Sequence, residues 1–288
     1  MQPEPIRDIA HLGHVELLTP KFEDSRRFFI DIMGMTQSGE KDGSVYLRGW
    51  DDYERYSLKL TDAKTSGLGH AAFRTRSPQA LERRAAALKG SGFDIGWTDG
   101  DLGHGKTFVF KDPDGHRFEI YYDTEWYEPP RELRPALKNQ AQKFPARGIN
   151  VRRIDHFNGL AVDIKANREF FQNYLGFMLT EQIVLDDGTE AGMWMTATNK
   201  SYDFAYTRDH TGTKGRLHHV TFALDAREDV PARRITRWIF TPSIFFVMND
   251  YGSPARVLSR RTTTTLAERN SESDLHLDGL SPHRLMQP

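Results

Sequence analysis

Histidines near the start of short apolar strands are the residues of this sequence most able to do chemistry. In RIDHFNGLAV, the alternation of side chains along a strand puts His156 and Asn158 on the same face. In LHHVTF, the same alternation predicts that His218 and His219 point to opposite faces, so at most one of them lines a given cavity. Two imidazoles from neighbouring strands and one carboxylate would make a 2-His-1-carboxylate triad, which leaves positions on Fe(II) open for a substrate and O2.

Each of these histidines also has a simpler interpretation, as a partly buried strand residue with a structural hydrogen bond. For any histidine taken singly, the structural interpretation is the more common one, because buried and perturbed histidines also occur far from functional sites. The repeated placement of histidines at the start of similar sequence units favours a functional role.

Four copies of one unit must position these histidines. HVELLTPKFEDSRRFFIDIMGM from His14 and HFNGLAVDIKANREFFQNYLGF from His156 each predict a strand, a loop, an amphipathic helix and a glycine stop. The second unit opens with LGHAAFRT, before Ser77 as a helix N-cap and Pro78 at the first helical position, and the fourth opens with LHHVTFALD. We therefore predict an α+β fold of four βαβββ-type modules, paired into two half-barrel domains, with the last module disrupted.

The domain boundaries follow from a charged, proline-bearing stretch, EPPRELRPALKNQAQKFPARG. We predict an N-terminal module pair at residues 1–127, a linker at 128–148 and a C-terminal metal-site domain at 149–230. Residues 231–288 form an atypical tail.

The composition excludes several classes of protein. The chain has no cysteine, which excludes disulfides, thiolate metal sites and cysteine nucleophiles. Its formal net charge of -1 argues against a nucleic-acid partner. No run of roughly 18 apolar residues and no signal pattern is present, so we expect no membrane association and a cytoplasmic protein.

The motifs VRRIDHFNGLAV, GFMLTEQIVLDDGTEAGMWM and KGRLHHVTF resemble the two-domain extradiol ring-cleaving dioxygenases of the vicinal oxygen chelate superfamily, of the catechol 2,3-dioxygenase type. The resemblance covers about residues 8–230. It implies meta cleavage of a catechol-type diol by O2 at a non-haem Fe(II), with Mn(II) as an alternative, in the degradation of aromatic compounds. It implies that His156 and His219 are metal ligands and that Asn158 and Trp194 line the substrate pocket, and we expect a homo-oligomer.

Tyr202 departs from the pattern of that family. Many relatives carry a histidine in the segment written here as NKSYDFAY, and that histidine is their acid–base residue. A phenol at this catalytic position could donate a hydrogen bond to bound oxygen, but a pKa of about 10 makes it a poor base at neutral pH. Two interpretations stay open: altered substrate choice within a subfamily, or no catalytic role.

The tail after Val230 departs further. The family takes its third ligand, a glutamate, from a GGNRxE-like strand, and nothing after Val230 resembles it, while lysine is absent after Lys214. A shift of reading frame near Val230 would explain this tail, because family-like codons read in the neighbouring frame yield Ala232–Ile235 and Thr262–Thr265. A divergent or disordered tail is the alternative. In either case we expect the fourth module to lose its closing strands and the activity to be impaired.

The N-terminal half offers a complete set of its own, His14, His70 and Glu119, at corresponding places of the first two modules. The resemblance implies that this half is metal-free, and packing is the simpler role for these residues. A different class of function therefore remains: a small-ligand-binding protein of the same fold, either metal-free or using this N-terminal site.

Overall fold

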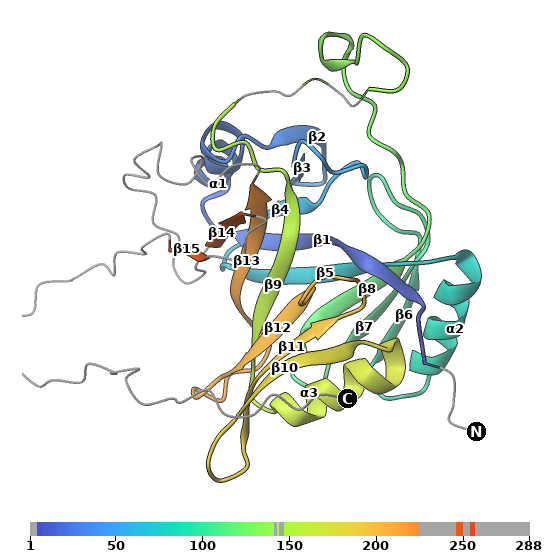
Figure 1. The fold of residues 1–288 in the computed structure, drawn as a ribbon, viewed down its shortest axis with the longest axis vertical. Coiled ribbons are helices and arrows are strands. Elements are labelled where there is room, and N and C mark those ends of the chain that lie inside the picture. Colours follow the sequence, from blue (N-terminus) through green and yellow to red (C-terminus); the bar gives the residue numbers. More distant parts are fainter. Residues whose placement is uncertain (1–4, 141–142, 144–146, 225–245, 250–253, 257–288) are drawn as a thin grey trace, which may run out of the picture.

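A computed structural model of the chain describes residues 5–140, 143, 147–224, 246–249 and 254–256. These residues form two mixed β-sheets with a few short helices, which confirms the predicted α+β class. Figure 1 shows the two sheets packed together, with α2 and α3 on their outer sides. No helix in these residues is long and apolar enough to cross a membrane.

The first two modules form one eight-stranded sheet, in the order β2-β3-β4-β1-β5-β8-β7-β6. Its strands are β1 (Ile9–Thr19), β2 (Thr36–Lys41), β3 (Ser44–Arg48), β4 (Leu58–Asp62), β5 (Gly67–Thr75), β6 (Asp94–Thr98), β7 (Thr107–Lys111) and β8 (Arg117–Tyr121). The opening strands of the two modules, β1 and β5, pair antiparallel at the centre, and β4 and β8 flank them in parallel. The predicted pairing of modules is confirmed.

The last two modules form a seven-stranded sheet, in the order β10-β11-β12-β9-β13-β14-β15, in which the third module repeats the strand order of the first. Its strands are β9 (Arg153–Ala161), β10 (Met178–Val184), β11 (Glu190–Thr196), β12 (Phe204–Arg208), β13 (Arg216–Leu224), β14 (Phe246–Asn249) and β15 (Pro254–Arg256). Here β9 and β13 form the antiparallel centre, and β12 and β14 are the parallel flanks.

The prediction that the fourth module loses its closing strands is wrong in part. β14 and β15 lie beside β13, and the run FVMN of β14 consists mostly of residues that favour strands. Among the described residues, this sheet nevertheless has one strand fewer than its N-terminal counterpart. The stretch Ala232–Ile235 and the threonine run, on which the frame-shift hypothesis depends, lie outside the described residues.

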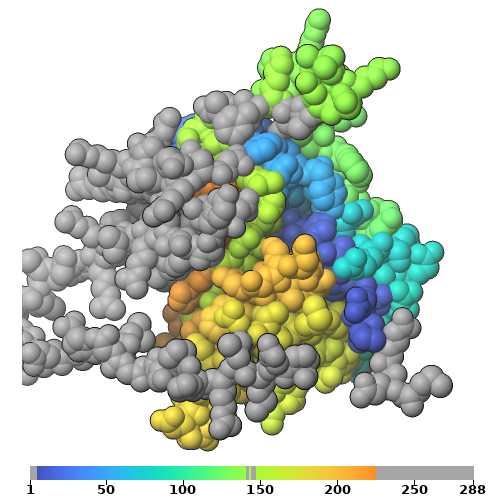
Figure 2. Space-filling view, in the orientation of Figure 1, coloured from blue at the N-terminus to red at the C-terminus, as the bar shows by residue number. Residues whose placement is uncertain are grey.

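Three helix boundaries, at Ser77, Gly34 and Gly176, lie where local signals predicted them. The helices are α1 (Phe22–Arg27) with the π-helical turn η1 (Phe28–Ile32), α2 (Pro78–Leu88), the 3-10 turn η2 (Arg131–Leu133), and α3 (Ile164–Phe170) with the π-helical turn η3 (Phe171–Leu175). The Ser77 hydroxyl accepts a hydrogen bond from the backbone N–H of Ala80 at 3.0 Å, which caps α2. Gly34 and Gly176 follow the first and third helical segments with φ of 75° and 74°, a conformation that side chains disfavour. Residues 128–140 are largely exposed and stand off the surface, as Figure 2 shows in green.

The two sheets share one hydrophobic core. Aromatic rings meet across the boundary, for example Phe118 with Phe157 at 6.0 Å and Phe73 with Phe204 at 5.9 Å between ring centroids. The turn between β7 and β8 adds a polar connection, since the buried carboxylate of Asp114 accepts hydrogen bonds from the backbone of the other half and from Asn167 Nδ2 at 2.6 Å. The two halves are therefore joined by hydrogen bonds as well as by apolar packing.

His116 adds a second connection in the same turn. Its Nδ1 lies 2.8 Å from the Asp112 carboxylate and its Nε2 lies 3.0 Å from the Arg216 carbonyl oxygen, and both of these groups only accept hydrogen bonds. Burial alone would lower the pKa of His116, but the hydrogen bond and charge of Asp112 raise it above the ordinary value. The geometry thus favours a charged imidazolium between the halves.

Candidate functional site

One row of paired residues crosses four strands of the C-terminal sheet. Trp194 on β11 pairs with Ala205 on β12, Ala205 pairs with Asn158 on β9, and Asn158 pairs with His219 on β13. Directly paired residues carry their side chains on the same face of a sheet. His156 lies two residues before Asn158 on β9 and shares that face. The register thus collects four of the predicted site residues on one face.

The two histidines of this row are buried and close together. His156 Nε2 lies 3.4 Å from His219 Nε2, and the two residues are 3% and 8% exposed. The Asp155 carboxylate accepts from His156 Nδ1 at 2.6 Å, so in the neutral ring Nε2 carries the lone pair. Burial, helped by His156 and His218, lowers the pKa of His219 to about 3, which keeps this ring neutral. Neutral imidazoles are the form that binds a metal ion.

Tyr202 joins this group from the loop before β12. Its ring lies 4.6 Å from the His156 ring, between centroids. Burial, together with the charges of Asp155 and Glu181, raises the pKa of the phenol above its ordinary value. Tyr202 therefore stays protonated at neutral pH and can donate a hydrogen bond, in agreement with its expected weakness as a base.

The prediction that His218 and His219 point to opposite faces is wrong. A β-bulge separates the pairing of Leu217 from that of His219, and His218 is the extra residue in it. The two ring Nδ1 atoms lie 2.6 Å apart, which opposite faces would not allow. Strict alternation fails here because a bulge inserts one unpaired residue and turns its side chain.

The position of the third ligand can be compared between the sheets by register. On β5 and β8, the residue two places after His70 pairs with Glu119. On β13 and β14, the residue two places after His219 pairs with Phe246. Phe246 thus holds the register position that Glu119 holds in the other half. The described residues of the C-terminal half supply two imidazoles but not the three-ligand set that a non-haem iron or manganese centre uses.

In the N-terminal half, the structure brings together His14, His70 and Glu119. His14 Nε2 lies 3.0 Å from His70 Nε2, and His70 Nε2 lies 3.6 Å from a carboxylate oxygen of Glu119. All three residues are buried. Within the described ranges, this is the only group of three potential ligands whose atoms lie within 4.8 Å of one another.

The corresponding row of the N-terminal sheet is filled with charges. It runs through Tyr46, Lys59, Glu16 and His70. Lys59 Nζ lies 3.3 Å from Glu16 and 2.7 Å from Asp101, which also accepts from the Tyr46 hydroxyl at 2.8 Å. Burial alone would raise the pKa of Glu16, but its partners, His70 foremost, lower it to about 2. The N-terminal row is therefore a charged network, whereas the corresponding row of the C-terminal sheet is uncharged.

Sequence reasoning missed three residues around the N-terminal triad: Glu16, Tyr56 and His104. The Tyr56 ring lies 4.6 Å from the His14 ring, as Tyr202 does from His156. The two tyrosines are equivalent, since each lies two residues before the strand that pairs in parallel with the histidine strand. That repeated spacing was the available signal for Tyr56. Glu16 and His104 carried no such signal, because Glu16 meets His70 and His104 meets His14 only across distant parts of the chain.

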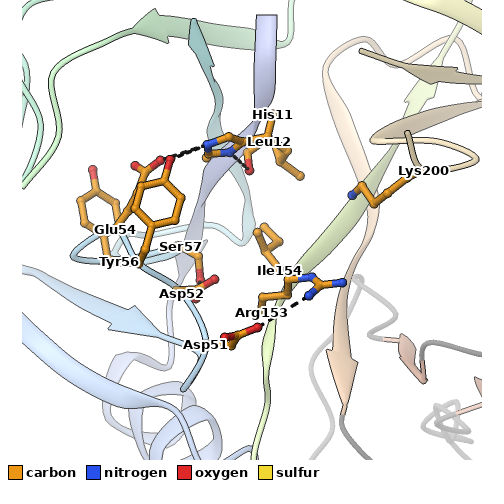
Figure 3. A pocket seen from close by; sticks show the side chains of 12 residues that line it. His11, Leu12, Asp51, Asp52, Glu54, Tyr56, Ser57, Arg153, Ile154 and Lys200 are labelled. Atoms are coloured by element: carbon orange, nitrogen blue, oxygen red, sulfur yellow. Dashed lines mark hydrogen bonds and ion pairs between the residues drawn. The ribbon is translucent and has the colours of Figure 1, made fainter. Parts of the chain in front are cut away.

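A cavity of about 200 Å³ lies between the halves. Figure 3 shows His11, Glu54 and Tyr56 on one side and Arg153 and Lys200 on the other. The cavity is smaller than the roughly 300–1,000 Å³ of ordinary ligand pockets. None of the predicted catalytic, metal or substrate residues lines it, so it does not form part of the predicted site.

Comparisons with known proteins agree with this architecture. A profile of the Glyoxalase/Bleomycin resistance protein/Dioxygenase superfamily matches residues 11–120 and 153–233. The chain is 43% identical to a metapyrocatechase of Geobacillus stearothermophilus, over 76% of this chain and 67% of that protein. It is 36% identical to a manganese-dependent 2,3-dihydroxybiphenyl 1,2-dioxygenase of Geobacillus genomosp. 3, over 77% of this chain and 71% of that protein. The structure of the 2,3-dioxygenase LapB from Pseudomonas sp. KL28 superposes with a TM-score of 0.70 at 25% identity, over 77% of each chain.

Proposed function

Because this chain belongs to the extradiol dioxygenases of the glyoxalase/bleomycin resistance protein/dioxygenase superfamily, we propose that it acts on a catechol-type aromatic diol with O2 and a divalent metal, Fe(II) or Mn(II). The observation that carries this proposal is the row that brings Trp194, Asn158 and His219 onto one face with His156. A diol bound against this row would meet neutral side chains and two imidazoles. In such an arrangement, orientation by the protein supplies much of the rate.

Each residue of the row has a proposed role. His156 and His219 are the imidazole ligands, and Asn158 and Trp194 bind the substrate. The Asn158 side chain is held by a hydrogen bond from its Nδ2 to the Thr207 hydroxyl at 3.1 Å, which orients the amide before substrate binds. Tyr202 donates a hydrogen bond to the reacting oxygen. Two imidazoles hold Fe(II) weakly, so we expect impaired activity that depends on added metal.

The same proposal includes the division of the chain into residues 1–127, 128–148, 149–230 and 231–288, and a homo-oligomer. The shared aromatic core makes it unfavourable to separate the two halves, since separation would expose large buried rings such as Phe118 and Phe157. Light scattering on the purified full chain measures the oligomeric state directly.

A second candidate function is binding of a small ligand without turnover. The buried group of His14, His70 and Glu119 favours it, because this group needs no contribution from the C-terminal half. Binding without oxygen consumption would distinguish it from ring cleavage.

The proposed activity is tested with protein purified without oxygen and then supplied with Fe(II) or Mn(II). Oxygen uptake is measured with a panel of catechols, and the product is weighed by mass spectrometry, where ring cleavage adds both oxygen atoms of O2. We expect weak uptake that is lost in His156→Ala and kept in the matched control Glu119→Gln. No uptake from folded, metal-loaded protein with any diol of the panel would refute the proposal.

A further inference from the structure

We propose that His14, His70 and Glu119 form a separate binding site for a divalent transition metal, in the half of the chain that the proposed ring cleavage does not use. This site goes beyond the proposed function, because binding there requires neither His156 nor His219. Two imidazoles and one carboxylate with open positions are the ligand set of non-haem Fe(II), and the same nitrogen and oxygen ligands accept Mn(II).

The distances between the three ligand groups fit a shared metal ion. Two ligand atoms about 2.1 Å from one metal, at adjacent corners of an octahedron, lie about 3.0 Å apart. The two ring nitrogens, His14 Nε2 and His70 Nε2, are 3.0 Å apart. The carboxylate oxygen of Glu119 lies 3.6 Å from His70 Nε2, a separation too long for a hydrogen bond but within reach of a shared ion.

The tautomer of His70 is set by a second carboxylate. Glu16 Oε2 lies 2.8 Å from His70 Nδ1, and a carboxylate only accepts, so the proton of the neutral ring is on Nδ1 and the lone pair is on Nε2. The Thr61 hydroxyl donates to the other oxygen of Glu16 at 2.6 Å and holds it in place. A carboxylate behind a metal-binding imidazole is the usual outer-shell arrangement of histidine ligands.

Gly69 makes this outer shell possible. It precedes His70 at the bulge of β5, and a Cβ atom at this position would collide with the Glu16 carboxylate. The glycine therefore lets Glu16 approach the strand closely enough to reach His70. A packing role for the histidines would not require this approach.

Glu119 is a buried acid whose nearest basic partners lie beyond hydrogen-bond distance. The residue is 8% exposed, and its contacts within the described part of the chain are His70 Nε2 at 3.6 Å and Arg117 at 4.0 Å. No hydrogen-bond donor reaches its carboxylate there. Burying an ionised carboxylate without donors is costly, and a divalent cation between it and the imidazoles would remove that cost.

His104 is an independent sign that the space beside the triad is built for a ligand. The Gly105 carbonyl oxygen lies 3.2 Å from His104 Nδ1, so this nitrogen carries the proton and Nε2 carries a lone pair. Nε2 is buried and has no hydrogen-bond partner among the described residues. Its ring lies 5.2 Å from the His14 ring, between centroids. Buried polar atoms are normally satisfied, and a water on a metal held by the triad could donate to this one.

The test uses the full chain, stripped of metal with a chelator and titrated with Mn(II), with free Mn(II) counted by electron paramagnetic resonance. The wild-type chain is expected to bind Mn(II) and to melt at a higher temperature when it is present. In Glu119→Gln, the affinity is expected to fall by more than the roughly 10–100-fold that loss of an outer-shell partner costs. The matched control changes both histidines of the other half, His156→Ala with His219→Ala, and is expected to keep the wild-type affinity of this site.

The opposite outcomes would overturn the proposal. They are wild-type affinity in Glu119→Gln, loss of all binding in the double control variant, or no binding by folded wild-type chain. Circular dichroism and the melting temperature without metal show whether each variant folds. If Glu119→Gln does not fold, Glu16→Gln decides, since it leaves all three ligands in place: an affinity lowered about 10–100-fold supports the site and an unchanged affinity rejects it. Oxygen uptake is not part of this readout, so the two proposals fail separately.

Discussion

The two halves of the molecule share a strand arrangement at their centres but carry different side chains at the corresponding positions. The N-terminal half holds three potential metal ligands close together, but ion pairs of Lys59 with Glu16 and Asp101 occupy its row. The C-terminal half has an uncharged row, with Ala205 at the position of Lys59 and Asn158 at that of Glu16, but Phe246 at the position of Glu119. The register of the strands fixes these positions in both halves, and the side chain at each position decides which ligands that half could hold.

The bulges of the central strands show the same contrast on a smaller scale. The extra residue is Gly69 on β5 and His218 on β13. The glycine admits the Glu16 carboxylate behind His70, whereas the His218 ring contacts His219. The residue at the bulge therefore has opposite effects in the two halves. In the N-terminal half it lets a carboxylate orient His70, and in the C-terminal half its own imidazole packs against His219.

The largest expected effect concerns the connection between the halves. Asp114→Ala removes the acceptor of three hydrogen bonds and leaves their buried donors without a partner. We expect this change to lower the free energy of unfolding by about 4 kcal/mol. At about 2–4 °C per kcal/mol, the melting temperature should fall by about 10 °C. The control is Asp186→Ala, at an exposed turn. Equal melting temperatures for the two variants would mean that the halves stand independently.

The second prediction moves the third potential ligand, a glutamate, from the N-terminal to the C-terminal half. In a Glu119→Gln background, Phe246→Glu puts a carboxylate at the third-ligand register position of the C-terminal sheet. We expect Mn(II) affinity there to rise by about 100-fold or more, since a third ligand completes the set. Adding His219→Ala should abolish the gain. An unchanged affinity would show that matching register is not sufficient to place the ligand.

The third prediction concerns the bulge. Gly69→Ala should displace the Glu16 carboxylate from His70 and lower Mn(II) affinity in the N-terminal half by about 10–100-fold. His218→Ala, at the matching bulge, should leave that affinity as it is. Both variants are measured by the Mn(II) titration. An equal loss of Mn(II) affinity in the two variants would contradict the proposed difference between the two bulges.

The smallest effect is a dependence of stability on pH. The pKa of His116 is raised in the folded protein, so the stability it contributes is fully present below about pH 6.5 and is lost as the pH rises through the folded pKa. As the pH rises above about 6.5, the melting temperature of the wild-type chain should therefore decline more steeply than that of His116→Gln. Parallel curves for the two proteins would show that the charge of His116 does not hold the halves together.

The parts of the fold that sequence reasoning recovered are those with local causes. Gly34 and Gly176 stop helices because they adopt positive φ, and Ser77 starts one because its hydroxyl satisfies a free N–H. His156 and Asn158 share a face because alternation holds between them. The failures have non-local causes: the bulge at His218 depends on pairing with β9, and β14 depends on β13 to receive it.

By itself, the sequence determined the repeated module, the family and the identity of the four central-strand histidines that meet in pairs, since periodicity and turn residues act over a few positions. The sequence also indicated Glu119 and Tyr202, whereas only the tertiary structure showed that Glu16 and Tyr56 join the N-terminal pair. Glu16 and Tyr56 reach their histidines across 54 and 42 positions of the chain. Such partners are set by the register of four strands and by one bulge, and a register is a property of paired strands that no single strand carries.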